Sequence, residues 1–400
     1  VEGHYRLAQR LEQRADRNAA VVELRAVLEQ EPDHLDARLD LARTLRRLGK
    51  LEEAVAQTRS AFDRAGQPMD IAEELYWLLC EADDRQGAID LLTLLDDDRS
   101  DADALATVAQ FQRQLGRMAE ARTVASHIRA LDPDASTIAL AETDLAEGLV
   151  EHAIEQALTV PEKSKRFLQA RRVVIEGLIK AKHPDRALAI VEPLRKARPD
   201  DLELAFAEAF AHAEAGDAAK ARELANQLKG DAMVVAFLRA RILDHIGDDA
   251  GALAILEPAL RANPDHVGGL NLAGYILADL PDKDVGKIGS MTRGRKERLD
   301  AAERYLAHAR DLQPGDPSIL DSWGWMLYQR GRTREAVRVL DRATRFSPRE
   351  PEILVHLAAA WAADGAPRTA AEVLDRAEKL APSPTVKRRI DALRAGLAIR

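Results

Sequence analysis

The chain has 400 residues, of which 46% are hydrophobic, 4% aromatic and 31% charged, with a formal net charge of −9. Ala, Leu, Arg and Glu dominate these classes and favour helices, so the composition excludes a mainly β protein. The negative charge argues against a nucleic-acid binder, and the lack of any run of about 20 apolar residues argues against a membrane span.

A short phrase recurs along the chain: a Gly, often after Leu, then polar residues and an Ala that begins an apolar stripe, as from Leu48-Gly49 to Ala54. Successive Ala positions lie 31 to 34 residues apart, except for one step of 50. They are Ala20, Ala54, Ala88, Ala121, Ala153, Ala187, Ala221, Ala252, Ala302, Ala336 and Ala370. Most units end in a turn with Pro, which helix interiors exclude. We therefore predict eleven units of helix A, turn, helix B and turn.

This unit resembles the tetratricopeptide repeat, whose helix A has a small residue twelve positions before the recurrent Ala. Nine units have Ala or Gly there: Ala8, Ala42, Ala109, Ala141, Ala209, Ala240, Gly274, Gly324 and Ala358. Tyr76 and Ile175 are the two exceptions. A small side chain lets helices A and B approach closely. The resemblance implies an all-α, right-handed superhelical solenoid of about eleven helix pairs over residues 1–382.

The long step is 16 residues longer than a normal step of 34, and the extra residues lie within the stretch 279–296, between helix A and helix B of the ninth unit. Gly, Lys and Arg dominate this insertion. Insertions in solenoids gather on one edge and are often functional, so Lys287, Arg293, Arg295 and Lys296 are candidates for an accessory binding loop. The alternative is a flexible loop that the fold tolerates, because extra loop length adds little entropic cost.

Residues 383–400 follow the last unit and have a helical pattern. Val386, Ile390, Leu393 and Leu397 share one face, which predicts a C-terminal capping helix over the last repeat. The basic residues of this segment are expected mostly on other faces, in contact with water. They are Lys387, Arg388, Arg389 and Arg394.

Motifs of catalysis are missing from the sequence. It contains no His-Glu-x-x-His, no Gly-x-Ser-x-Gly and no phosphate-loop pattern. The single cysteine, Cys80, excludes an intramolecular disulfide and a cysteine-based zinc site, and is expected to be a packing residue. We therefore expect no enzyme, no cofactor and no bound metal.

In tetratricopeptide arrays the A helices line the concave face, and the repeat register assigns eight aromatic residues to it. These candidates for contact with a protein or peptide partner are Tyr5, Trp77, Phe206, Phe210, Phe237, Tyr275, Trp325 and Tyr328. The three Phe are expected to form one cluster, and the last three residues another. Neighbouring A helices could instead bury these rings against each other. Trp323 and Trp361 fall on core positions.

Residues 266–375 are similar to a group of bacterial outer-membrane lipoproteins whose repeats activate a carboxyl-terminal processing protease and deliver its substrates. The similarity rests on the stretches 270–279, 316–328 and 351–357. It implies a non-catalytic adaptor in the periplasm or at the outer membrane, with membrane contact only through a lipid anchor that this sequence lacks. The cytoplasm stays open as a location. The alternative function is a structural scaffold for pilus, exopolysaccharide or other envelope secretion assembly.

Overall fold

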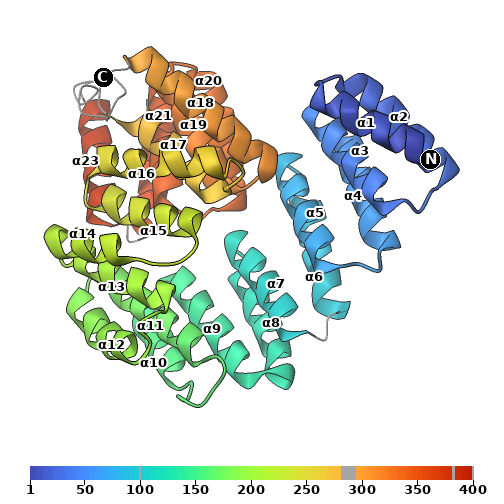
Figure 1. The fold of residues 1–400 in the computed structure, drawn as a ribbon. Coiled ribbons are helices and arrows are strands. Elements are labelled where there is room, and N and C mark those ends of the chain that lie inside the picture. Colours follow the sequence, from blue (N-terminus) through green and yellow to red (C-terminus); the bar gives the residue numbers. More distant parts are fainter. Residues whose placement is uncertain (99–100, 281–293, 381–382, 399–400) are drawn as a thin grey trace. The chain divides into compact units, whose positions relative to one another are not determined.

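The computed structural model describes residues 1–98, 101–280, 294–380 and 383–398. Over these residues the chain forms 23 α-helices and no strand (Figure 1). The helices come in eleven consecutive pairs, followed by the single helix α23. The all-α array of about eleven helix pairs predicted from the repeat period is confirmed.

The helices belong to two compact units, each described by itself. Unit 1 comprises residues 1–94 with 313–316, and unit 2 comprises residues 95–312 and 317–400. The helices of unit 1 are α1 (Glu2–Gln13), α2 (Arg17–Gln30), α3 (Leu35–Arg47), α4 (Leu51–Arg64), α5 (Met69–Glu81) and most of α6 (Arg85–Asp98).

Unit 2 contains the remaining helices. They are α7 (Ala102–Gln114), α8 (Met118–Leu131), α9 (Pro133–Glu147), α10 (Val150–Leu158), α11 (Phe167–Lys180), α12 (Pro184–Ala197), α13 (Leu202–Glu214), α14 (Ala218–Gln227), α15 (Ala232–His245), α16 (Asp249–Ala262), α17 (Val267–Asp279), α18 (Arg295–Leu312), α19 (Pro317–Gln329), α20 (Thr333–Phe346), α21 (Pro351–Ala363), α22 (Pro367–Lys379) and α23 (Pro384–Ala398).

The recurrent small residues lie where the two helices of a pair meet. All eleven recurrent Ala residues have 0% exposed surface. A Cβ atom added at Gly324 would lie 2.5 Å from Cγ of Leu340, and one added at Gly274 would lie 2.5 Å from Cγ of Leu306. Such distances are too short for real Cβ contacts, so close approach of the helices requires the small residue.

The turn between the helices of a pair has the same backbone form with or without glycine. The glycines of the recurrent phrase have φ between 74° and 86°; they are Gly49, Gly116, Gly148, Gly216, Gly247, Gly331 and Gly365. In three units without this glycine, Ala15, Asp83 and Lys182 take its place with φ of 58° to 61°. Because this region costs a non-glycine residue roughly 1–2 kcal/mol, helix packing imposes the turn in these units.

The insertion of the ninth pair separates α17 from α18. The loop candidates Lys287 and Arg293 lie outside the described residues. Arg295 and Lys296 belong to the first turn of α18 instead of a loop. Nη2 of Arg295 donates a 2.6 Å hydrogen bond to the carbonyl of Gln329, which ties the start of α18 to the end of α19.

The last helix, α23, packs against α21 and α22 of the final pair (Figure 1). Val386 and Ile390 are buried, and Leu393 and Leu397 pack partly buried on the same core. The apolar face of this segment therefore covers the end of the last pair.

Some other sequence predictions concern single residues and bound groups. Cys80 is fully buried, and burial raises the pKa of its thiol, as expected of a packing residue. Trp323 and Trp361, expected in the core, are half-buried and pack against its edge.

Within the described ranges, no helix is long and apolar enough to cross a membrane. In that same part of the chain, no group of three or more His, Cys, Asp or Glu could hold a metal ion.

Candidate functional site

The eight aromatic candidates are all half-buried, and the structure distributes them over both units. In unit 1, the hydroxyl of Tyr5 donates a 2.8 Å bond to Asp40, and burial together with this carboxylate raises the pKa of Tyr5 to about 12. Trp77 meets Tyr76 edge-on, with 5.1 Å between ring centroids. Tyr5 lies on α1 and Trp77 on α5, so each contacts a different set of neighbours.

The phenylalanine cluster, which comprises Phe206, Phe210 and Phe237, lies on α13 and α15 of unit 2. The rings of Phe206 and Phe210 are 5.6 Å apart. The guanidinium of Arg241 lies 4.9 Å from the ring centroid of Phe206 and 5.7 Å from that of Phe237. Phe206 and Phe237 therefore share one cation, which lies over their electron-rich faces, while Phe210 joins the cluster through its contact with Phe206.

The tryptophan cluster, which comprises Tyr275, Trp325, Tyr328 and His356, joins the first helices of three successive pairs. Trp325 stacks on Tyr328 with 4.8 Å between centroids, and on His356 with 4.3 Å. The ring of Tyr275 lies 6.1 Å from that of His356. His356 has no exposed surface, so it is the buried member around which the other rings gather.

Carboxylates and one arginine surround the tryptophan cluster. Nε1 of Trp325 donates a 2.8 Å bond to Asp279 at the end of α17, and Nη2 of Arg389 donates a 2.9 Å bond to the other oxygen of that carboxylate. Nη1 of Arg389 also lies 3.2 Å from the hydroxyl of Tyr275 and 3.3 Å from Glu352. Arg389 was expected to be solvated; its side chain is only 32% exposed, because α23 packs so close to α21 that the guanidinium reaches α17.

Hydrogen bonds fix the state of His356. Its Nδ1 lies 2.8 Å from Asp321, and its Nε2 lies 3.2 Å from Nη1 of Arg389. Because a guanidinium only donates, Nε2 accepts and the Nδ1 proton points to Asp321, which makes the imidazole neutral in this arrangement. Burial opposes protonation, but the charges of Asp321 and Glu352 outweigh it and raise the pKa of His356.

A further carboxyl group, Asp244 on α15, is influenced by charges around both clusters. Burial raises its pKa from 3.8 to about 7, and the charges of Asp249, Glu352 and Asp279 act in the same direction. Arg241 of the phenylalanine cluster acts in the opposite direction. Asp244 and the carboxylates that raise its pKa therefore repel one another and favour a cation nearby.

Sequence reasoning missed His356, Asp321 and Arg389. His356 does not fall on a position that the repeat register assigns to the concave face. Asp321 does fall on such a position but has no aromatic ring, and Arg389 was assigned to a water-exposed face. These three residues lie on α19, α21 and α23, which are not consecutive helices, so the order of the repeats does not show that they come together.

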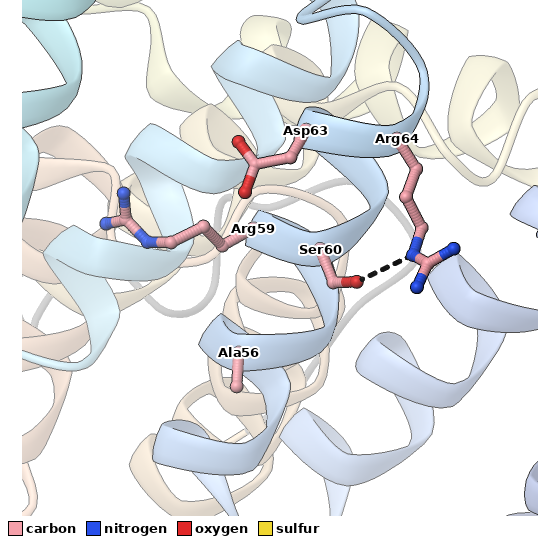
Figure 2. Close-up of a pocket in the computed structure, with 5 residues that line it drawn as sticks. All are labelled: Ala56, Arg59, Ser60, Asp63 and Arg64. Carbon is pink, nitrogen blue, oxygen red and sulfur yellow. Dashed lines mark hydrogen bonds between the residues drawn. The ribbon is translucent and has the colours of Figure 1, made fainter. Parts of the chain in front are cut away.

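Unit 1 has a surface depression on α4, whose lining residues are arranged differently from those of the tryptophan cluster. Its lining residues come from this one helix: Ala56, Arg59, Ser60, Asp63 and Arg64. Figure 2 shows the side chains of Arg59 and Arg64 extending to opposite sides of the helix, with Arg64 bonded to Ser60 at 3.3 Å. These groups do not converge on a common point, so the depression is a weaker candidate than the tryptophan cluster.

Comparisons with known proteins identify the class of repeat. Residues 11–68 and residues 322–383 match the tetratricopeptide repeat family, one segment in each unit. A TPR repeat-containing protein of Pseudomonas aeruginosa is 29% identical over 177 residues. That match covers 43% of this chain and 27% of the relative, so the chain matches about a quarter of that protein. The repeat type predicted from the sequence is confirmed in the two matched segments.

Solved structures of helical proteins are also similar. Yeast Tom70 aligns with 100% of this chain and 96% of its own, at 11% identity and a TM-score of 0.41. One chain of the APC/C hetero-tetramer Cut9–Hcn1 aligns over 98% of this chain and 90% of its own length, at 14% identity and a TM-score of 0.44.

Proposed function

We propose that this protein is a non-catalytic scaffold that binds a protein partner through the tryptophan cluster, and that the partner is a carboxyl-terminal processing protease of the bacterial cell envelope. The observation that supports binding is a set of half-buried rings on the first helices α17 and α19, packed against the buried His356 of α21. The resemblance of residues 266–375 to envelope adaptors supports the choice of partner, because the cluster lies within that segment.

The chemistry of the tryptophan cluster suits a binding surface. Trp, Tyr and Arg are enriched among the residues that contribute most to protein interfaces. Tyr328 is the outer ring of the stack, since Trp325 lies between it and the buried His356. A partner that covers Tyr328 would bury a flat ring whose orientation is already fixed, so little conformational entropy would be lost.

The proposal is tested by binding of the purified protease from the bacterium that encodes this chain. We expect Tyr328→Ala to weaken binding at least tenfold, equal to about 1.4 kcal/mol, with unchanged helix content by circular dichroism. Tyr328→Phe keeps the ring and should retain binding. Leu158→Ala removes an exposed apolar side chain on α10 and should have no effect.

Two results would contradict the proposal. Tyr328→Ala could melt far earlier than the wild type, in which case the ring is part of the core. Capture from the native bacterium could instead recover cytoplasmic proteins or a pilus or exopolysaccharide assembly protein, and the protease assignment would then be wrong.

A further inference from the structure

The groups around Arg389 form an acceptor set that matches a guanidinium. Asp279 and Glu352 supply carboxylate oxygens, Tyr275 a hydroxyl and His356 a ring nitrogen, all within 3.3 Å of its two terminal nitrogens. A guanidinium presents five donors in one plane and is therefore suited to several acceptors around its edge. An ammonium has three donors in a tetrahedral arrangement and matches such a set less well.

The acceptor set is held in place by contacts that do not involve Arg389. Asp279 accepts from Trp325 at 2.8 Å. The hydroxyl of Tyr275 donates to Glu352 at 3.2 Å. His356 is fixed by its bond to Asp321 and by stacking on Trp325. We therefore expect these acceptors to keep their positions when the arginine leaves.

Arg389 comes from the last helix of the chain, whose other polar contacts are weak. Lys387 pairs with Glu378 and Asp391, and Arg394 pairs with Asp375 and Glu378, all with side chains at least 36% exposed. Exposed pairs of this kind contribute about 0–1 kcal/mol each. The Arg389 side chain is itself 32% exposed, so a change of its rotamer can take the guanidinium away from its acceptors without unfolding unit 2.

We propose that Tyr275, Asp279, Glu352 and His356 form a binding site for a guanidinium group, that Arg389 is its internal ligand, and that an arginine side chain of a bound partner takes its place. Charge supports this occupant, because removal of Arg389 leaves the carboxylates of Asp279 and Glu352 without the cation that both contact. The guanidinium site itself stands independently of the proposed function; only the identity of the partner rests on it.

The experiment uses the full chain with Arg389→Ala and the small cation N-ethylguanidinium, with ethylammonium at equal ionic strength as the reference. Arg388→Ala is the matched control, because Arg388 is the exposed neighbour on α23 and bonds only to Thr385 among the contacts described. Binding is measured by isothermal titration calorimetry and by the shift of the melting temperature.

We expect N-ethylguanidinium to bind Arg389→Ala with a dissociation constant in the millimolar range and to raise its melting temperature. The wild type and Arg388→Ala should bind at least tenfold more weakly, since their site is filled. Adding Asp279→Asn to Arg389→Ala should abolish binding. Equal binding to all variants, or no preference over ethylammonium, would overturn the proposal.

A second variant is used if Arg389→Ala folds poorly. Arg389→Gln keeps a hydrogen-bonding side chain and removes the charge, and the same binding by N-ethylguanidinium is expected of it. Because no partner protein is present, failure of this titration is distinct from failure to bind the protease. In the protease assay, Arg389→Ala should raise affinity at least tenfold if the partner supplies an arginine; unchanged or lower affinity would contradict displacement by the partner.

Discussion

The phenylalanine and tryptophan clusters of unit 2 occupy corresponding faces of their repeats and differ in what holds the rings. Phe206, Phe210 and Phe237 have no polar atoms, and one guanidinium lies over two of their faces. In the tryptophan cluster, by contrast, the indole N–H of Trp325 and the hydroxyl of Tyr275 bond to carboxylates. In the first cluster no hydrogen bond fixes the orientation of the rings. In the second, hydrogen bonds fix both the rings and the cation, Arg389.

This difference shows that repeat position alone does not decide chemistry. The same places on the first helices hold side chains that contact different neighbours in each pair. Rings are held in fixed orientations when they pack on a buried polar residue. Of the two clusters, as far as the structure describes them, only the tryptophan cluster has such a buried anchor, which is the imidazole of His356.

The largest expected effect comes from removing that anchor. His356→Ala leaves Asp321, which is only 8% exposed, without its partner and opens space beneath Trp325. We expect a loss of about 2–4 kcal/mol in the free energy of unfolding, measured by urea denaturation.

The control for this variant is an exposed pair of the same type. His308 lies 2.7 Å from Asp265, with side chains 40% and 70% exposed. His308→Ala should change the unfolding free energy by less than about 0.5 kcal/mol. If the two variants lose equal stability, burial of His356 does not anchor the cluster.

A smaller effect, dependent on pH, is expected at Asp244. Its pKa of about 7 in the folded chain exceeds the ordinary 3.8, so between these values the folded state holds a proton that the unfolded state has lost. The stability contributed by this group is therefore lost as the pH rises from about 4 to about 7.

Asp244→Asn should remove that dependence. Each pKa unit corresponds to roughly 1.4 kcal/mol, and after solvent screening we expect the variant to be more stable than the wild type by about 1–3 kcal/mol at pH 8. The two should be equal near pH 4. Urea denaturation at both pH values measures the difference, and a gain that is independent of pH would contradict the assignment.

The smallest effect is expected at Arg241. Arg241→Ala removes the cation from the faces of Phe206 and Phe237 and should cost about 0.5–1 kcal/mol. Arg241→Lys keeps the charge without the planar group and should lose less. A loss above about 2 kcal/mol, measured by thermal or urea unfolding, would mean that this cluster also depends on a directional anchor.

Much of the fold could be predicted from the sequence, because one period determines where helices meet. The recurrent Ala residues, the small partners such as Gly324 and the site of the insertion all follow from it. The aromatic candidates were found by the same register. The polar half of the site was not, because Arg389 reaches Asp279 across 110 positions of the sequence. A 34-residue period describes neighbouring helices and contains no information on such distances.

The left-handed turns at Ala15, Asp83 and Lys182 have a wider consequence for how such chains are recognised. The turn persists where glycine is missing, so the glycine residue is dispensable while the backbone conformation of the turn is kept. Comparison by sequence finds the repeat family at residues 11–68 and 322–383. The helix pairs continue between these two segments, although the residues typical of the repeat are fewer there. In proteins of this kind, the spacing of pairs is a better record of common architecture than any single residue.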